Sequence, residues 1–308
     1  FFFKQKTAYE IRNCDWSSDV CSSDLLFGGR IIGKIGKVEV AAQQVKTRET
    51  SSLNSEDFSV IRLKQNFWKE SSVGVLYTRR HTSKGNEFKP PLPDRNTLGV
   101  DLTRNTSTFL KNQNLQFQAF AIFHNPNTLN EINNSIWDRS ARGIRINFPN
   151  DPWSGSLSYR EFGNWYDPAV GFSRRNSFRR VEPRIRFSPL LEKSSIIREL
   201  QWEISFENLM SLDWKRLTQN IRLTPLSIRF ESGDEISYQI IKNFESLEYD
   251  FNILGDNSII IPTGDYSNWK HQIEFETANH RKVVYEIDRK STRLNSSHSS
   301  VSRMPSSA

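Results

Sequence analysis

Apolar residues recur at every second position along most of this chain, a spacing that is typical of half-buried β-strands and not of helices. Each such segment predicts a strand with one apolar and one polar face, and there are about 13 or 14 of them. The clearest apolar sets are Val38, Val40, Ala42; Ile61, Leu63, Phe67; Val73, Val75, Tyr77; Leu98, Val100, Leu102; Leu115, Phe117, Ala119, Ala121, Phe123; Ile144, Ile146, Phe148; Val181, Ile185, Phe187; Leu200, Trp202, Ile204, Phe206; Leu226, Ile228, Phe230; Ile236, Tyr238, Ile240; and His271, Ile273, Phe275.

The connections between these segments are of two kinds, which alternate along the first half of the chain. Short connections rich in turn-forming residues fall at 36–37, 69–71, 150–153 and 231–234. Long polar connections fall at about 48–57, 82–94 and 125–134. Short turns at one end and long loops at the other are typical of an up-and-down meander, and of outer-membrane barrels in particular. The predicted fold class is therefore all-β: an antiparallel up-and-down meander, a fragment of an outer-membrane-type β-barrel.

Two segments leave alternatives open. Leu190–Leu200 is compatible with two or three helical turns and equally with a connection between strands. The glycine-rich start, 28–36, favours a tight hairpin over a phosphate-binding loop, because no Lys-Ser/Thr pair follows at the needed spacing. Several clean alternations last only five or six residues, whereas a membrane-spanning strand needs about 9 to 11.

The two ends of the chain resemble translated sequencing-adapter DNA and are excluded from fold reasoning. One permitted coding of Asp15–Asp24, read on the opposite strand in a shifted frame, yields the residues from Asp288 to Ser297. We therefore divide the chain into an artefact at 1–25, a β-barrel-like domain at 26–287 that is truncated at both ends, and a second artefact at 288–308. We expect the chain to be an internal piece of a longer exported protein.

Excluding the flanks changes what composition allows. Seven of the 42 basic and five of the 35 acidic residues lie there, so 35 basic and 30 acidic residues remain, a mild positive excess. Cys14 and Cys21 also lie in the leading flank, which leaves no disulfide, thiolate metal site or Cys nucleophile in the β-rich segment. No run of about 18 apolar residues predicts a transmembrane helix.

Several phrases of the chain together resemble a bacterial family, domain of unknown function 5916. The phrases are Gly29–Lys37 (GRIIGKIGK), Asp57–Leu63 (DFSVIRL), Val73–Arg80 (VGVLYTRR), Leu98–Leu102 (LGVDL), Tyr159–Arg174 (YREFGNWYDPAVGFSR) and, late in the chain, Arg229–Tyr266. The resemblance is collinear over nearly all of Leu26–Glu286. It implies an outer-membrane-associated protein of Gram-negative bacteria, whose β-rich region follows a carbohydrate-binding-like domain that would lie upstream of this chain. It implies no catalytic residues.

Paired carboxylates are the leading catalytic candidates, because glycoside hydrolysis needs two of them across a sugar ring. Glu161 and Asp167 are weak candidates, since the turn-like 163–166 segment between them would bring them close. Their alternative role is loop structure or lining of a polar interior. Glu203 and Glu207 lie two pleats apart, roughly 13 Å by strand rise, which is too far for either hydrolytic geometry.

An arginine cluster at 174–186 is the strongest local deviation in composition. It consists of Arg174, Arg175, Arg179, Arg180, Arg184 and Arg186. Arg180, Glu182, Arg184 and Arg186 share one strand face, which in a barrel lines the lumen with paired charges. We favour this lumen charge cluster over a solvated face or an anionic-ligand or nucleic-acid surface.

The histidines and aromatic residues complete the candidates. His81, His124, His271 and His280 have no metal-ligand spacing, so we expect loop-edge roles, no metal site and no cofactor. The aromatic residues near predicted strand ends favour a membrane-interface girdle, with sandwich-core or sugar-stacking roles as alternatives. They are Trp68, Tyr77, Trp153, Tyr159, Trp165, Tyr166, Trp202, Trp214 and Trp269.

The functional hypothesis is a non-catalytic module of the bacterial outer membrane, accessory to capture or passage of glycans or nutrients. Its expected partners are outer-membrane lipid and, through the upstream domain, glycans, but not nucleic acid. Two alternatives stay open: a glycan-active hydrolase with loop-borne carboxylates, and a soluble extracellular β-sandwich interaction domain. They differ in where the apolar sets face, toward lipid or into a dry layer between sheets.

Overall fold

The structure of the chain is a computed structural model. It describes residues 25–49, 54–68, 70–83, 90, 92–126, 135–171, 173, 175–252, 260–281 and 285–296. Arg174 of the predicted arginine cluster, Cys14 and Cys21 lie outside the described residues.

Fourteen strands form one sheet, in which each strand pairs with the next one along the sheet order β1-β2-β3-β4-β5-β6-β7-β8-β9-β10-β11-β12-β15-β16. Two short strands, β13 and β14, pair with each other within the β12–β15 connection. The bounds are β1 Leu25–Ile35, β2 Val38–Thr47, β3 Glu56–Phe67, β4 Ser71–Thr82, β5 Arg95–Phe109, β6 Gln113–His124, η2 Ile136–Arg139, β7 Ser140–Pro149, β8 Trp153–Phe162, β9 Phe178–Phe187, β10 Ile197–Ser211, β11 Arg216–Phe230, β12 Glu235–Leu247, β13 Phe251–Asn252, β14 Ile260–Ile261, β15 Gly264–Glu276 and β16 Glu286–Ser296.

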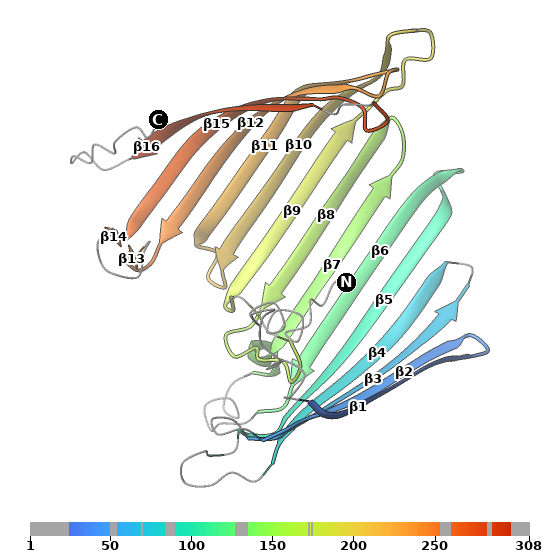
Figure 1. Ribbon diagram of the computed structural model, residues 1–308, viewed down its shortest axis with the longest axis vertical. Helices are drawn as coiled ribbons and strands as arrows, with labels where there is room; N and C mark the ends of the chain where they lie inside the picture. Colours follow the sequence, from blue (N-terminus) through green and yellow to red (C-terminus); the bar gives the residue numbers. More distant parts are fainter. Residues whose placement is uncertain are drawn as a thin grey trace. The chain divides into compact units, whose positions relative to one another are not determined.

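The predicted all-β, antiparallel up-and-down meander is confirmed. Figure 1 shows β1 to β6, in blue to green, lying side by side in chain order, and β10, β11, β12, β15 and β16 doing the same. The expected short turns join β1 to β2, β3 to β4, β7 to β8 and β11 to β12. The sheet order is linear, so β1 and β16 are its edges.

The strands are longer than the clean alternations in the sequence. Those of the large sheet have between 10 and 15 residues, because polar and apolar residues outside the strict alternation still join the ladder through their backbone groups. This length meets the requirement for a membrane-spanning strand.

Contacts divide the chain into two compact units, with boundaries inside β7, β8 and at the start of β9. Unit 1 consists of Phe1–Ile146 and Ser158–Arg179, and unit 2 of Asn147–Leu157 and Arg180–Ala308. The strands of each unit have an apolar and a polar face.

In unit 1 the apolar residues of neighbouring strands form continuous rows. Ile61, Tyr77, Leu98 and Phe123 are register partners across β3 to β6, and so are Leu63, Val75, Val100 and Ala121. Ile61, Leu63, Val73, Val75, Leu98 and Val100 are between 40% and 49% exposed. The described residues therefore leave these rows uncovered.

Unit 2 repeats this construction. Leu226, Tyr238 and Ile273 are register partners across β11, β12 and β15, and the next row holds Ile228, Ile236 and Phe275. Trp202, Leu223, Leu226, Ile236, Trp269 and Ile273 are all classed as exposed. The apolar side chains of this unit are thus not buried in a dry layer by the described residues.

The structure excludes one of the two structures that the sequence allowed for Leu190–Leu200, a helix or a strand connection. It forms no helix: Leu190 makes an isolated bridge to Glu199, a turn follows, and β10 begins at Ile197. The strand connection is the correct alternative, because the second half of this segment carries apolar residues that continue the rows of the sheet.

The last strand, β16, extends into the segment that resembles adapter sequence. Residues 288–296 pair with β15 in a regular antiparallel register. Ile287 of β16 lies opposite Phe275 and continues that apolar row, but Arg289 lies opposite Ile273 and Ser291 opposite His271, so the other two rows end at β15. Pairing here depends on backbone hydrogen bonds, which any extended segment can supply at a sheet edge.

The predicted aromatic girdle is wrong for one of its members. Tyr166 is only 4% exposed and packs in a small cluster with Ile122 and Ala141. Tyr159 donates a hydrogen bond to Glu161 and lies on the same face of β8 as the exposed Leu157. Trp68, Trp153 and Trp214 do lie exposed at or beside turns, as expected.

Candidate functional site

The predicted charge cluster is assembled on the polar face of unit 2. Arg180 donates from Nη2 to Glu182 at 2.8 Å and to Glu207 at 2.7 Å. Arg184 and Arg186 both bind Glu203, at 2.7 and 3.1 Å. Arg180, Arg184 and Arg186 therefore each have a carboxylate partner on β9 or on β10. The sequence pattern of β9 alone did not identify the partners on β10.

A hollow of about 250 Å³ lies beside this cluster. Besides Arg184, Arg186 and Glu203 it is lined by charged and amide side chains of β10, β11, β12 and β15, among them Gln201, Arg222, Glu235, Gln239 and Glu274. Charges of both signs line it, which suits a water-filled polar surface held by ion pairs.

Glu161, the first weak catalytic candidate, lies near the end of β8 on the same face as Leu157, and three donors hold it there. Its carboxylate accepts hydrogen bonds from Arg142 at 2.5 Å, from Arg179 at 3.2 Å and from the Tyr159 hydroxyl. Only 9% of its side chain is exposed. A carboxylate held by two guanidinium groups is strongly stabilised in its charged form, which suits a structural anchor and opposes a role as proton donor.

Asp167, the second candidate, has a separate partner. Its side chain lies in the β8–β9 loop (residues 163–177) and binds Arg95 at 3.1 Å. No bond joins Asp167 to Glu161 among the described residues. The structure thus gives the two carboxylates different roles instead of one shared acid–base pair.

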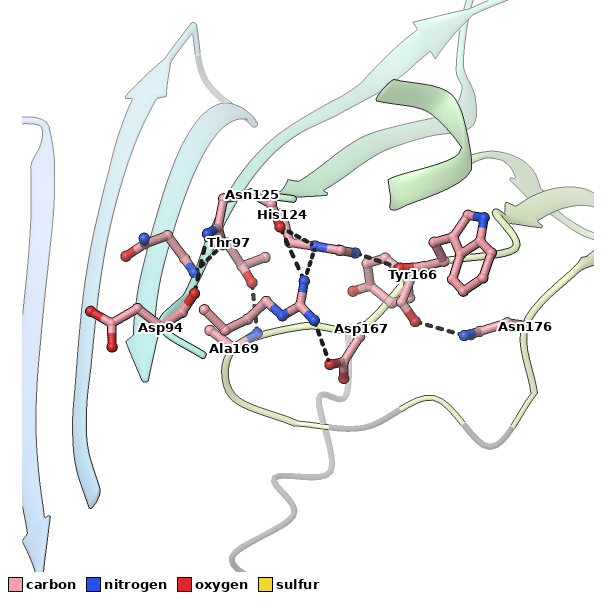
Figure 2. Close-up of polar contacts among 11 residues, drawn as sticks. Asp94, Thr97, His124, Asn125, Tyr166, Asp167, Ala169 and Asn176 are labelled. Atoms are coloured by element: carbon pink, nitrogen blue, oxygen red, sulfur yellow. Dashed lines mark hydrogen bonds and ion pairs between the residues drawn. The ribbon is translucent and has the colours of Figure 1, made fainter. Parts of the chain in front are cut away.

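Arg95 is the centre of a cluster that fastens the β8–β9 loop to β5 and β6 (Figure 2), and only 7% of its side chain is exposed. Its Nη1 lies 2.8 Å from Nδ1 of His124 and donates to the Asn125 carbonyl at 3.0 Å. His124 lies 2.6 Å from the Trp165 carbonyl through Nε2. Because a carbonyl oxygen only accepts, Nε2 of His124 donates to Trp165, while Nδ1 lies 2.8 Å from both the Arg95 guanidinium and the Asn125 carbonyl.

Two more bonds hold the loop in the same place. The Ala169 amide donates to the Thr97 hydroxyl at 2.7 Å, and Asn176 donates to the Tyr166 carbonyl at 2.7 Å. Burial, followed by the charge of Asp167, raises the pKa of Tyr166 far above its usual value, so its hydroxyl stays protonated. We call these contacts the loop latch: Arg95, Thr97, His124, Trp165, Tyr166, Asp167, Ala169 and Asn176.

The start of the loop requires a glycine. Gly163 donates to the Ser140 carbonyl at 2.9 Å, and Trp165 donates to the Asp138 carbonyl at 2.8 Å. A Cβ atom on Gly163 would collide with the backbone of Asp138. The Gly163 position therefore allows the loop to turn close against the η2 segment and to carry Tyr166 onto the polar face beside Ile122.

Asp94 lies next to the latch, just before β5. Its carboxylate binds His81 at 2.6 Å and Arg79 at 3.2 Å, and its carbonyl accepts from Asn125 at 3.1 Å. Partial burial raises the pKa of Asp94, but hydrogen bonds from His81 and Arg79 outweigh it, and the net pKa is lowered. His81 is thus a hydrogen-bond partner of Asp94 at a loop edge.

A second and larger hollow, of about 550 Å³, lies on the polar face of unit 1. Three register rows cross it from β3 to β6: Asn66, Ser72, Thr103, Gln118; Lys64, Gly74, Asp101, Phe120; and Arg62, Leu76, Gly99, Ile122. Gly99 lies on its floor and contributes no side chain. Arg62 and Asp101 form an ion pair across Gly74, and a Cβ atom there would collide with both.

Sequence reasoning missed the latch and the hollow. The latch joins residues up to 72 positions apart. The residues next to Arg95 and His124 in the sequence give no indication of such a contact. A signal for the hollow was present at Gly99, a polar-face position inside β5, where glycine weakens a strand unless something else approaches closely.

The described residues contain neither a metal site nor a membrane-crossing helix. Among the described residues, no three His, Cys, Asp or Glu side chains come together in a way that would hold a metal ion. Within the same residues, no helix is long and apolar enough to cross a membrane. Comparisons of the chain with family models, curated proteins and solved structures find no match.

Proposed function

We propose that this chain is a non-catalytic β-module of the bacterial outer membrane, whose apolar face contacts lipid and whose polar face contacts water, and that it assists the capture or passage of glycans or nutrients. The observation that carries the proposal is the contrast between the faces. Rows such as Leu63, Val75, Val100 are exposed, while the opposite face of the same strands carries paired charges such as Arg62 and Asp101.

The cost of exposing apolar surface supports a lipid partner. Each square ångström of apolar surface left in water costs roughly 25 cal/mol, and soluble monomers rarely expose large contiguous apolar patches. The rows run across neighbouring strands within each unit, which is the pattern that a hydrocarbon layer covers.

The alternatives have less support. A hydrolase needs a carboxylate free to exchange protons, and Glu161 is bound by three donors. A soluble sandwich needs a second layer over the apolar face, and no element among the described residues lies over the rows of unit 1. For nucleic acid, Arg180, Arg184 and Arg186 are already paired with carboxylates.

The test compares charges placed on the two faces. Val100→Arg puts a cation on the apolar face of β5, and Gln116→Arg puts one on the polar face of β6. In lipid vesicles we expect Val100→Arg to lower the free energy of unfolding by about 2–4 kcal/mol and Gln116→Arg by less than about 1 kcal/mol. Urea titrations of the vesicle-bound chain measure both values.

Two outcomes would contradict the proposal. One is equal destabilisation by the two substitutions, since the faces would then share one environment. The other is a chain that stays monomeric in buffer without lipid, with its apolar rows protected from a hydrophobic dye.

A further inference from the structure

The hollow of unit 1 has a glycine on its floor and longer side chains around it. Gly99 of β5 lies on the floor, while Lys64 of β3 and Phe120 of β6 stand on either side. Its volume, about 550 Å³, falls within the range of roughly 300–1,000 Å³ typical of small-molecule sites. The hollow is therefore built into the strand register and does not depend on a loop.

Polar groups without partners line one side of it. Thr103, Asn105 and Gln118 have no hydrogen bond or ion pair from their side chains within the part of the chain that the structure describes. Side-chain amides both donate and accept hydrogen bonds, and so does a hydroxyl. A ligand that matches this side must itself present groups that donate and accept.

The charges of the hollow compensate one another. Arg62 is paired with Asp101 across the floor, and Lys64 lies 3.6 Å from Glu39. Glu70, in the β3–β4 turn, is the remaining charged group of the lining. With two cations and two anions, the lining has no excess charge to bind an ionic ligand.

The other side of the hollow is apolar. Phe120 lies two positions from Ile122 on the same face of β6, and Leu76 stands across the floor. The phenyl ring is fixed in place because it lies over Gly143 of β7, where a Cβ atom would be 2.7 Å from its Cε1. A flat apolar ligand surface can pack against such a ring.

We propose that this hollow binds a neutral saccharide, with ring hydroxyls on Thr103, Asn105 and Gln118 and the C–H face of the sugar on Phe120. A sugar combines the required properties: no charge, hydroxyls that donate and accept, and an apolar ring face. The inference deepens the proposed function by naming the class of ligand on the polar face. It rests on that function only in requiring this face to be open to water.

The test uses the whole chain in lauryldimethylamine oxide micelles, because this detergent has no sugar headgroup. Saturation-transfer difference NMR is recorded with cellobiose, and with glucuronate and glucosamine as charged comparators. We expect cellobiose to bind in the millimolar range and both charged sugars to bind more weakly. Gln118→Leu removes one hydrogen-bonding amide and weakens binding about tenfold.

Two further variants keep the test specific. Gly99→Val fills the floor, since its first carbon would meet Ile122 at an ordinary 3.4 Å, and we expect it to abolish binding. Gln116→Leu, on the same strand and face but outside the hollow, leaves binding unchanged. The far-ultraviolet circular dichroism of each variant checks that the sheet has formed. If Gly99→Val does not fold, the comparison of Gln118→Leu with Gln116→Leu tests the inference.

Three results would overturn the inference: no cellobiose signal from the unmodified chain, equal signals from glucuronate, or Gln118→Leu and Gln116→Leu binding alike. Failure of the proposed function is a separate result. A chain that binds cellobiose but shows no difference between Val100→Arg and Gln116→Arg in vesicles contradicts the membrane assignment alone.

Discussion

The polar faces of the two units have the same strand alternation but different chemistry. In unit 1 the face carries amides, hydroxyls and two ion pairs around a hollow of about 550 Å³. In unit 2 it carries a dense network of arginines and glutamates around a hollow of about 250 Å³. The alternation thus decides which face is polar, but the residues that occupy the polar positions decide what that face can bind.

Glycine accounts for part of this difference. Gly99 opens the floor in unit 1, whereas no glycine lines the hollow of unit 2. In unit 2 the corresponding space is occupied by long side chains such as Arg184 and Arg222. A face lined by small residues leaves room for a ligand, while a face lined by paired charges holds strands together.

The largest expected effect comes from removing the loop latch, which only unit 1 has. Arg95→Leu leaves His124, the Asn125 carbonyl and Asp167 without their shared donor, and we expect a loss of about 3 kcal/mol in the free energy of unfolding. Limited proteolysis should show earlier cleavage in the β8–β9 loop.

Arg79→Leu is the matched control for the latch. Arg79 is also an arginine with an aspartate partner, Asp94, but 46% of its side chain is exposed, so its loss costs less than about 1 kcal/mol. Equal losses for the two substitutions would show that the latch contributes nothing beyond a surface ion pair.

An intermediate effect is expected in the charge network of unit 2. Glu203→Gln removes the carboxylate that Arg184 and Arg186 share, and we expect a cost of about 1 kcal/mol, reduced because both arginines are partly exposed. Glu207→Gln, which affects a more exposed carboxylate, should cost less. Urea titration distinguishes them, and a larger loss for Glu207→Gln would show that Glu203 does not organise the network.

The smallest effect concerns the β11–β12 turn of unit 2. Hydrogen bonds from Arg281, Ser232 and the Ala278 amide hold the pKa of Asp234 well below its usual 3.8. A lowered folded-state pKa stabilises the fold above the unfolded-state pKa, and this contribution is lost as the pH falls through the folded-state value. Asp234→Asn should therefore lower Tm at pH 7, with a difference that shrinks below about pH 4.

Asp213→Asn in the β10–β11 turn is the control, since the Asp213 carboxylate has no bond among the described residues. It should leave Tm unchanged across the same pH range. A difference for Asp234→Asn that persisted unchanged into acid would show that its charge is not the cause.

The faces of the strands were predictable because their cause is local. Successive side chains of a strand point to opposite sides, so Leu98 and Val100 had to share a face, and Arg180, Arg184 and Arg186 had to share the other. The charge cluster followed from β9 alone. Its partners Glu203 and Glu207 could be placed on one polar face but not matched to β9, because register between strands depends on pairing across the sheet.

The fate of the loops was not predictable because its cause is non-local. Tyr166 reads as an interfacial aromatic beside a strand end, yet the loop folds back and buries it against Ile122. Likewise, the sequence of Leu190–Leu200 fits a helix and a strand connection equally well. The two are distinguished by the pairing of β10 with β11, in which Ile197 lies opposite Phe230. Local pattern contains no information about which surface a loop will cover.

The most direct test of the two-faced sheet is to measure which face meets lipid. Single cysteines replace Val100 on the apolar face and Gln116 on the polar face in a chain without Cys14 and Cys21, and each is labelled with bimane. In vesicles whose acyl chains carry bromine, we predict strong quenching of the label at position 100 and little at position 116. Equal quenching at both positions, or quenching at 116 alone, would contradict the account.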